Sequence, residues 1–287
     1  MSNAPTAKYG LPLEVRFCKK CVISNQRPSS VIEFKNRSDA KKPTIGFDEE
    51  GVCSACHFAE LKDKGINWEE REKQLIELCD RYRKNDGSYD VIVPGSGGKD
   101  SAFTSHILKY KYGMNPLTVT WSPHKYTEIG WQNFQNWIHS GLDNVLFSPN
   151  GKVHRLLTRL AFENLCHPFQ PFIIGQRLIG PKFSILYDVP LIMYGENQAE
   201  YGNAIEENGK PTMDPAFYAE KASLEDVVLG GVTAKELIEK YGVTAGELNP
   251  YLPTDGERLR KMGSEVHYLG YYLKWDPQEC YYYAVEN

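Results

Sequence analysis

The stretch from Tyr89 to Leu108, "YDVIVPGSGGKDSAFTSHIL", constrains the fold more than any other part of the chain. A short apolar run leads into a loop with three glycines, and the loop leads into a run with helical periodicity. This order predicts a strand, a tight turn and a helix. Strand and helix signals go on alternating from about residue 67 onward. Alternation of this kind predicts an α/β fold in which a parallel sheet is covered by helices on both faces.

Residue patterning places the individual elements. Asn67 is a candidate N-cap of a helix over 67–85, and Asp276, followed by a proline, is a candidate N-cap of a helix over 276–287. We expect strands at 89–95, 115–121, 143–149, 189–197 and 265–275, and helices at 99–112, 127–141, 152–166, 171–188 and 233–242. The rest of 203–262 has no clear pattern. Because the sequence stops inside an aromatic-rich helix, we expect a further C-terminal segment.

Charge is distributed unevenly along the 287 residues. The net charge is −4, but residues 1–66 carry +3 and the remainder carries −7. An acidic main body argues against a large tRNA or duplex interface, which needs many contacts to phosphate. The sequence has neither a run of 18 uncharged apolar residues nor an apolar signal-peptide core near its start. We therefore expect a cytoplasmic protein with no membrane partner.

Residues 1–66 are irregular in pattern, and they contain two CxxC pairs, Cys18 with Cys21 and Cys53 with Cys56. Thiolates in such pairs bind Zn²⁺ tetrahedrally, and a small loop-rich module needs a metal to fold. We predict a four-cysteine structural zinc module over 1–66; redox cysteines or an iron–sulfur centre are the alternatives. His57 is a spare ligand only if one cysteine fails, and a plain surface histidine is the alternative. Three other cysteines lie singly in helix-like runs, where we expect core packing: Cys79, Cys166 and Cys280.

The glycine loop fits neither of two common phosphate-binding patterns. The Walker pattern needs a glycine where Val93 stands, and a Ser or Thr where Asp100 follows the lysine. The dinucleotide pattern GxGxxG also fails at Asp100. What remains is "SGGKDS" at a strand-to-helix turn.

The chemistry of that turn suits a pyrophosphate. Gly97 and Gly98 allow φ > 0, so several N–H groups can turn inward as an anion nest, while the following helix points its positive end at the same place. Lys99 adds a positive charge. Two hydroxyl groups add hydrogen-bond donors, those of Ser96 and Ser101. A plain helix-start turn is the alternative.

This loop resembles the PP-loop of the ATP pyrophosphatase superfamily, whose members cleave ATP between the α- and β-phosphates and transfer AMP to a substrate oxygen. The resemblance implies an adenine nucleotide α-hydrolase-like sheet with strand order 3-2-1-4-5 in residues 67–287. ATP is then expected over the C-terminal ends of the strands.

A CxxC pair on each side of a long loop, together with a PP-loop, leaves two subfamilies. One contains tRNA thiolation enzymes. The stretches "CKKCVISNQRPSSVIEF", "GVCSACHF", "HPFQPFIIGQ" and "YGENQAEYGN" instead resemble the N-acetyl sugar amidotransferases of the B-band lipopolysaccharide, pseudaminic acid and legionaminic acid pathways. These enzymes convert the acetamido group of a nucleotide-linked sugar into an acetamidino group. A non-catalytic ATP-binding protein with a zinc module is a third reading.

The loop residues have expected roles in such a reaction. Lys99 and the loop N–H groups would stabilise the departing pyrophosphate. Asp100 would help to hold Mg²⁺, although a helix-start carboxylate without that role is an equal alternative.

Further site residues are expected where strands of the sheet end. The run "YGENQAEYGN" places Glu196, Asn197, Glu200 and Tyr201 after the fourth strand, where carboxylates could orient Mg²⁺ or ammonia or act as a base. A plain solvated loop is the alternative there. Four residues are expected near the nucleotide: Gln176 and Arg177, where an arginine could meet a phosphate, and Thr120 and Trp121, where this fold normally frames the adenine.

The source of ammonia is expected to be another protein. No cysteine in the chain has the setting of a glutaminase nucleophile. The family resemblance implies a separate glutaminase and a cyclase-like ammonia-channel subunit, both related to the paired proteins of histidine biosynthesis.

Overall fold

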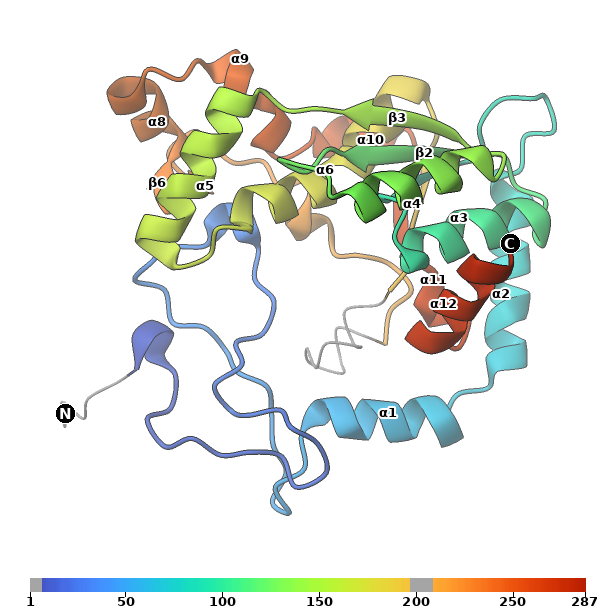
Figure 1. Ribbon diagram of the computed structural model, residues 1–287, viewed down its shortest axis with the longest axis horizontal. Coiled ribbons are helices and arrows are strands. Elements are labelled where there is room, and N and C mark those ends of the chain that lie inside the picture. Colours follow the sequence, from blue (N-terminus) through green and yellow to red (C-terminus); the bar gives the residue numbers. More distant parts are fainter. Residues whose placement is uncertain (1–6, 197–208) are drawn as a thin grey trace.

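The computed structural model describes residues 7–196 and 209–287 and contains a five-stranded parallel sheet (Figure 1). Its strands are β1 (Val91–Pro94), β2 (Pro116–Trp121), β3 (Asp143–Phe147), β4 (Leu191–Tyr194) and β7 (Glu265–Tyr268), in the spatial order β3-β2-β1-β4-β7. Because β7 is the fifth strand of this sheet along the chain, the expected α/β architecture and the order 3-2-1-4-5 are confirmed.

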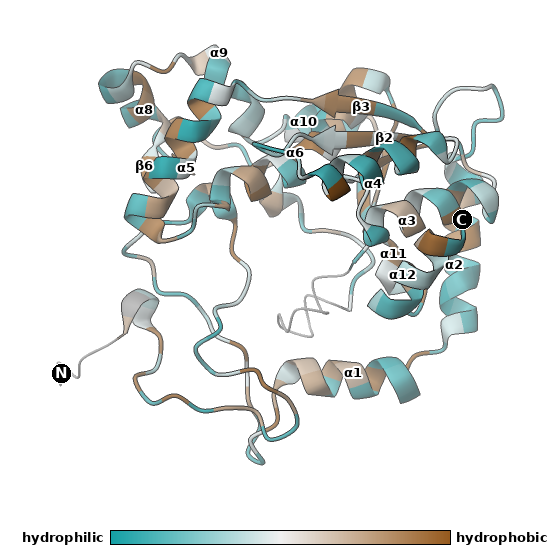
Figure 2. Ribbon diagram, in the orientation of Figure 1, coloured by the Kyte–Doolittle hydropathy of each residue, from teal (hydrophilic) through white to brown (hydrophobic). Residues whose placement is uncertain are grey.

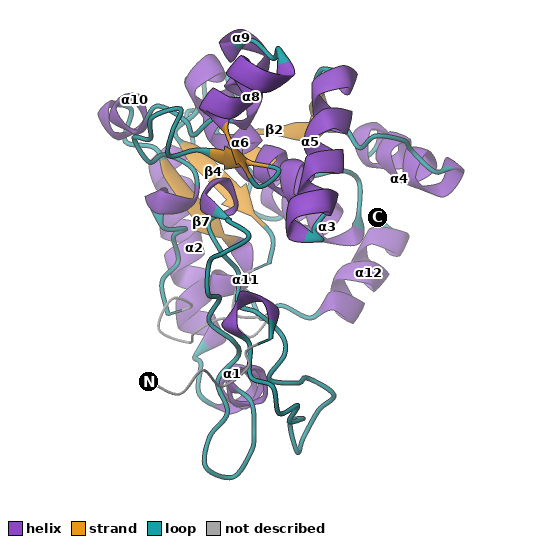
Figure 3. Ribbon diagram, turned by 90° about the vertical axis from the view of Figure 1, so that its left-hand side faces the viewer, coloured by secondary structure: helices purple, strands orange, loops and turns teal. Residues whose placement is uncertain are grey.

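Helices cover both faces of the sheet, as Figure 3 shows from the side. Side chains alternate between the faces along β1, so Val91 and Val93 pack with Leu75 and Leu78, while Ile92 joins the opposite core. The first face carries α2 (Trp68–Tyr82), α3 (Lys99–Tyr110) and α12 (Pro277–Glu286). The second carries α5 (Gly151–Leu165) and α6 (Gln170–Tyr187). Beyond the end of β2 lies α4 (Glu128–His139), which packs on α3.

The predicted helix caps are present. The Asn67 side chain accepts a hydrogen bond from the Glu70 backbone N–H at the start of α2. The Asp276 side chain accepts from the backbone N–H groups of Gln278 and Glu279 at the start of α12. Each bond satisfies a backbone donor that the helix itself cannot, which is why these side chains mark where a helix begins.

The second face holds the larger core. Trp121 is almost fully buried there and packs against α6 at Gly175, where an added Cβ would lie 2.2 Å from the indole ring. Figure 2 shows brown, apolar residues within β2 and in part of β3, while α2 is mostly teal. The continuous apolar runs are residues 91–93 in β1 and 191–193 in β4, which are fully buried, as is typical of central strands covered on both faces.

The N-terminal region contains a helix that sequence patterning missed. After η1 (Lys8–Gly10) and η2 (Glu33–Lys35), α1 (Ser54–Lys64) begins within the second CxxC pair. Phe58 is its only fully buried residue, so α1 has no apolar stripe from which it could be recognised.

Two other expectations were wrong. The strand expected over 265–275 ends at Tyr268 and is followed by α11 (Leu269–Tyr272). Cys79 and Cys280 are buried as expected, but Cys166 is exposed and ends α5 in the left-handed conformation, with φ of 51°. It marks a turn between two helices, so it does not pack in the core.

The region without a clear pattern folds as short elements beside α6. The described part contains η4 (Pro215–Phe217), an antiparallel pair formed by β5 (Val228–Leu229) and β6 (Val232–Thr233), α8 (Ala234–Tyr241), α9 (Ala245–Leu248), η5 (Asn249–Tyr251) and α10 (Gly256–Lys261). None of the described helices is long and apolar enough to cross a membrane.

Candidate functional site

The glycine loop turns sharply between β1 and α3. Gly97 has φ of +84°, and an added Cβ there would lie 2.6 Å from the Phe134 backbone, so only glycine fits. The Ser101 hydroxyl donates to the Gly98 carbonyl (3.0 Å) and accepts from the Ser96 backbone N–H (3.4 Å). The expectation that Gly98 also has φ > 0 was wrong. Gly98 is the extended N-cap of α3, with φ of −72°.

Lys99 and Asp100 form an ion pair at the start of α3, with 2.6 Å between Nζ and Oδ2. Burial alone would lower the pKa of Lys99, but the hydrogen bond and charge of Asp100 raise it. The lysine is therefore charged at neutral pH. Asp100 Oδ1 is buried and has no hydrogen-bond partner in the described part of the chain. This oxygen is open to a cation or a hydrogen-bond donor.

A cavity of about 440 Å³ brings the loop together with three other parts of the fold. It opens at the C-terminal ends of β1 and β4, where strand order changes direction and where open α/β sheets bind ligands. Eight of the predicted site residues line it: Ser96, Gly98, Asp100, Ser101, Trp121, Gln176, Arg177 and Glu196. We call this the loop cavity.

Arg177 is fixed at the wall of the loop cavity. Its Nη1 donates to the Val31 carbonyl (2.9 Å), and its guanidinium lies 5.1 Å from the centre of the Phe217 ring. Tyr194 at the end of β4 donates to the carbonyls of Gln176 and Arg177 (3.0 and 3.1 Å), which joins α6 to the strand ends. Burial raises the pKa of Tyr194, so its hydroxyl stays protonated. A cation held in this way can meet a phosphate without reorganising.

Several predicted residues lie elsewhere. Thr120 is fully buried and accepts a hydrogen bond from Asn144, so its side chain does not line the loop cavity. Gly97 and Lys99 line a neighbouring cavity of about 340 Å³ beside α12. Asn197, Glu200 and Tyr201 lie outside the described residues.

The loop cavity also contains residues that sequence reasoning missed. Ser30 reaches it from the N-terminal region, and Met213 and Tyr268 reach it from the sheet edge at β7. Ser30 stands in a stretch quoted for the family resemblance, but nothing in the local pattern shows that it lies next to a loop more than sixty residues away.

The four cysteines of the CxxC pairs meet as expected. Their sulfur atoms all lie within 4.8 Å of one another, with 3.8 Å between the Sγ atoms of Cys18 and Cys56 and 3.6 Å between those of Cys21 and Cys53. Four sulfurs at about 2.3 Å from one Zn²⁺ are themselves about 3.8 Å apart, whereas a disulfide needs about 2.05 Å. The arrangement therefore fits a tetrahedral metal ion.

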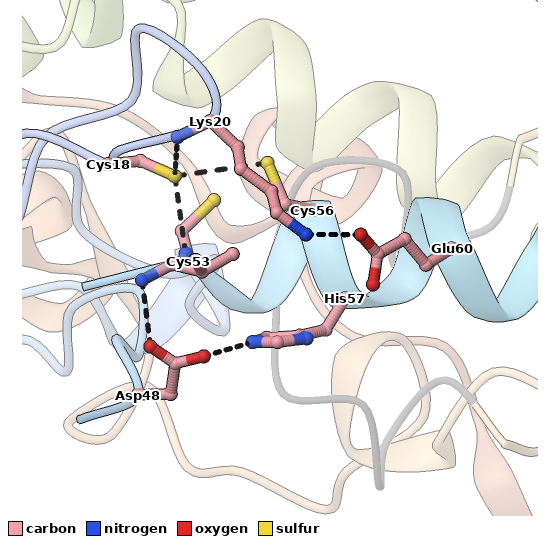
Figure 4. A network of polar contacts seen from close by, with 8 residues as sticks. Cys18, Lys20, Asp48, Cys53, Cys56, His57 and Glu60 are labelled. Atoms are coloured by element: carbon pink, nitrogen blue, oxygen red, sulfur yellow. Dashed lines mark hydrogen bonds and ion pairs between the residues drawn. The ribbon is translucent and has the colours of Figure 1, made fainter. Parts of the chain in front are cut away.

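Neighbouring backbone groups support a thiolate at Cys18, whereas burial raises the pKa values of Cys53 and Cys56 in the metal-free cluster. Burial would raise the pKa of Cys18, but backbone N–H groups of Lys20, Cys53 and Cys21 donate to its sulfur and lower that pKa to about 6. Figure 4 shows the surrounding contacts. His57 contacts Asp48 (2.6 Å) and is not a member of the cysteine cluster (Figure 4).

The N-terminal region is joined to the α/β body by buried contacts. Gln170, from the stretch "HPFQPFIIGQ", donates to the Glu33 carbonyl (2.7 Å) and accepts from the Gly230 N–H (2.8 Å). Phe34 is 2% exposed and belongs to the larger core. The Tyr9 hydroxyl donates to the Leu165 carbonyl (2.5 Å). The segment between the CxxC pairs therefore packs against α6 and contributes to the larger core.

Comparisons with known proteins give limited information. No family model matches the chain. An uncharacterized protein of Methanocaldococcus jannaschii is 35% identical over 78 residues, which is 27% of each chain, so the match spans about a quarter of that relative.

Similar solved structures include an NH3-dependent NAD synthetase from Campylobacter jejuni (16% identity, TM-score 0.33, 45% of this chain and 56% of that one). They also include an NMN synthetase from Francisella tularensis (13%, 0.34, 69% and 93%) and an NAD+ synthetase from Burkholderia pseudomallei (12%, 0.32, 82% and 96%). At these TM-scores the likeness decides nothing about activity.

Proposed function

We propose that the chain is an ATP-dependent, AMP-forming amidotransferase that converts the acetamido group of a nucleotide-linked N-acetyl sugar into an acetamidino group. The observation that carries the ATP-dependent part is the loop cavity, because an anion nest, Arg177 and two carboxylates meet there at the strand ends. The sugar part is supported by the sequence resemblance over the CxxC pairs and over the two stretches that flank β4.

The chemistry demands activation of an unreactive amide. An amide oxygen is a poor leaving group, so the oxygen first attacks the α-phosphate of ATP, and the bond from that phosphorus to the bridging oxygen of pyrophosphate breaks. Ammonia then adds to the carbon of the O-adenylyl imidate, and loss of a proton and of AMP leaves the amidine. Water must be excluded because it would return the imidate to the amide.

The loop residues suit the first step. In this proposal the backbone N–H groups of the turn and the positive end of α3 bind the phosphates, and charged Lys99, which lines the neighbouring cavity beside α12, reaches from there to stabilise the departing pyrophosphate. The open oxygen of Asp100 offers the hard ligand that Mg²⁺ prefers. A bound Mg²⁺ would neutralise charge on the phosphates.

Glu196 is proposed to serve the second step. It lies two residues beyond the end of β4 and lines the loop cavity. A carboxylate there can accept a proton from ammonia as it adds to the imidate carbon. The ammonia is proposed to arrive from a separate glutaminase through a channel subunit.

The test measures AMP, pyrophosphate and amidine with a UDP-linked N-acetyl sugar and MgATP. We expect ammonium to support turnover by the purified chain, and glutamine to do so only after a glutaminase and channel subunit are added, because the nucleophile for glutamine hydrolysis is expected on another chain. Turnover with glutamine alone would contradict the partner proposal. AMP release that needs tRNA and ignores the sugar would favour thiolation.

Two variants separate the steps. Lys99→Met should lower the rate of pyrophosphate release about a hundredfold or more, which is the size expected for the loss of one transition-state contact. Lys73→Met, at an exposed position of α2, is the control and should not lower it. Glu196→Gln should still release pyrophosphate but form less amidine. Equal loss of both products in Glu196→Gln would place this carboxylate in the adenylation step instead.

A further inference from the structure

A second cavity, of about 690 Å³, lies at the same edge of the sheet beside β2 and β3. Its floor is α5, and its walls are the segments that follow the two strands. Its lining residues are Ser122, Pro123, His124, Ser148, Pro149, Gly151, His154, Arg155, Thr158, Arg159, Phe162 and Pro168. None of them belongs to the loop cavity, but Trp121 lines that cavity and the next residue, Ser122, lines this one.

The charge of this cavity has one sign. Arg155 and Arg159 line it, and none of its described lining residues carries a carboxylate, although the whole chain has a net charge of −4. Arg155 is exposed and its side chain has no hydrogen bond or ion pair with residues 7–196 or 209–287. Arg159 has only a surface contact with Glu163 at 3.7 Å. The start of α5 at Gly151 adds its positive end to the same cavity.

A buried histidine in the lining has an unused ring nitrogen. His154 is 2% exposed, its Nδ1 contacts the Tyr251 hydroxyl (2.9 Å), and its Nε2 has no partner in the described chain. The Tyr251 hydroxyl has no other hydrogen bond among the described residues, so we assign it as the donor and His154 Nδ1 as the acceptor. The neutral His154 ring then carries its proton on Nε2. This arrangement leaves one buried N–H donor of a lining residue without an acceptor among the described residues.

The second histidine can be assigned in the same way. The Thr158 hydroxyl donates to the His154 carbonyl (2.8 Å), so it must accept from His124 Nε2 at 3.0 Å. Burial and the neighbouring charges lower the pKa of His124, and burial lowers that of His154 to about 4. Both rings are neutral at pH 7, which allows their centres to lie 4.1 Å apart. The charge of the cavity therefore comes from the arginines.

An exposed aromatic side chain also lines this cavity. Phe162 is 63% exposed although it is a large apolar residue, and it lines the cavity one turn beyond Thr158. An exposed phenyl ring beside arginines and hydroxyl groups offers a stacking surface for a planar base, next to donors for phosphate oxygens.

We propose that this cavity binds the nucleoside diphosphate group of the acceptor, with Arg155 and Arg159 on the diphosphate and Phe162 against the base. This assignment rests on the proposed function for the identity of the acceptor. ATP is the other phosphate compound of the proposed reaction, but its phosphates are proposed to bind at the glycine loop. Trp121 lines the loop cavity and the next residue, Ser122, lines this one, so the proposed acceptor would extend its sugar past the end of β2 toward the loop cavity.

The experiment is calorimetric titration of UDP into the full chain saturated with a non-hydrolysable ATP analogue, with uridine and inorganic pyrophosphate as separate ligands. Arg155→Gln with Arg159→Gln should weaken UDP binding about tenfold or more, as expected when charge-assisted hydrogen bonds are lost. Lys152→Gln, which removes an exposed cation of α5 outside the cavity lining, should change it less than twofold. Affinity for the ATP analogue should stay the same in all variants.

Phe162→Ala separates the base from the diphosphate. It should weaken binding of UDP and leave binding of pyrophosphate unchanged. The inference is overturned if UDP does not bind the saturated wild type, if Lys152→Gln weakens binding as much as the double variant, or if the double variant weakens the ATP analogue equally.

The inference and the proposed function can fail separately. UDP binding that depends on both arginines, in a protein that forms no amidine from any UDP-linked N-acetyl sugar, supports this site and overturns the proposed acceptor chemistry. Amidine formation with an unchanged KM for the sugar in the double variant overturns this site and supports the proposed function.

Discussion

Lys182 has a positive charge where burial makes that charge unfavourable. It lies in the second half of α6 beside a cavity of about 980 Å³, and its Nζ donates to the Asn249 carbonyl (3.0 Å). Burial lowers the pKa of this lysine to about 8. A carbonyl stabilises an ammonium less than a carboxylate does, so the cost of burial is not fully offset.

The sign of the effect on stability follows from this lowered pKa. Between about pH 8 and pH 10.5 the unfolded chain binds the Lys182 proton more tightly than the folded chain, so the free energy of unfolding rises with pH across that window. Below pH 8 the charge is present in both states and the penalty is complete.

We therefore expect Lys182→Met to raise the free energy of unfolding at pH 7 by roughly 1 kcal/mol. This is less than the free energy that corresponds to the whole pKa shift, because the ammonium is only partly buried and solvent screens it. The gain should shrink as pH rises from 8 to 10.5. Urea unfolding of both proteins at several pH values measures it. Lys221→Met, at an exposed position of the same cavity, is the control and should give no such pH dependence. A gain that is independent of pH would mean that packing, rather than charge, explains it.

At the scale of elements, α1 and the CxxC pairs depend on each other. The helix begins at Ser54, inside the second pair, and buries only Phe58. Little apolar surface holds it in place, so its stability must come from the cysteine centre at its start.

We expect about one Zn²⁺ per chain by elemental analysis, and about none in Cys21→Ser. Cys166→Ser, at an exposed cysteine outside the cluster, should keep its metal. Chelation should speed hydrogen exchange of the α1 amides far more than that of β1 or β4, because the sheet has its own core. A metal-free protein would contradict the zinc prediction, and so would iron with a visible absorption band.

Elements with a strong local signal could be predicted from the sequence, and those held by distant contacts could not. Asn67 and Asp276 show where helices begin because a cap is a contact within four residues. The hairpin of β5 and β6 has a local signal that was missed, the adjacent glycines Gly230 and Gly231 with positive φ, but its place against Gln170 and α5 depends on contacts far away in sequence. The same division applies to the site. The turn at Gly97 was predicted, whereas the place of Ser30 in the loop cavity depends on how the whole molecule folds.

At the scale of the whole molecule, the segment between the CxxC pairs connects the cysteine centre to the loop cavity. Ser30 lines that cavity, the Val31 carbonyl holds Arg177, and Phe34 lies in the main core. Loss of the metal should release this segment and disturb the position of Arg177. Chelated protein should therefore bind an ATP analogue at least several-fold more weakly than the metal-loaded protein.

Because coupling between two binding events is reciprocal, the ATP analogue should also tighten zinc binding by a similar factor, which equilibrium competition with a coloured chelator measures. UDP, which is proposed to bind in the other cavity, serves as the control ligand and should tighten zinc binding less. Equal zinc affinity with and without the analogue would show that the centre and the loop cavity are independent.

If that coupling is found, the contact between Arg177 and the Val31 carbonyl would make ATP binding depend on prior binding of the metal. A chain that has not yet acquired its metal would hold ATP poorly, so an incompletely matured protein would not waste the nucleotide on an imidate that water destroys. Metal loading and ATP consumption would be coupled through one short segment. No separate inhibitor or regulatory protein would be needed for that coupling.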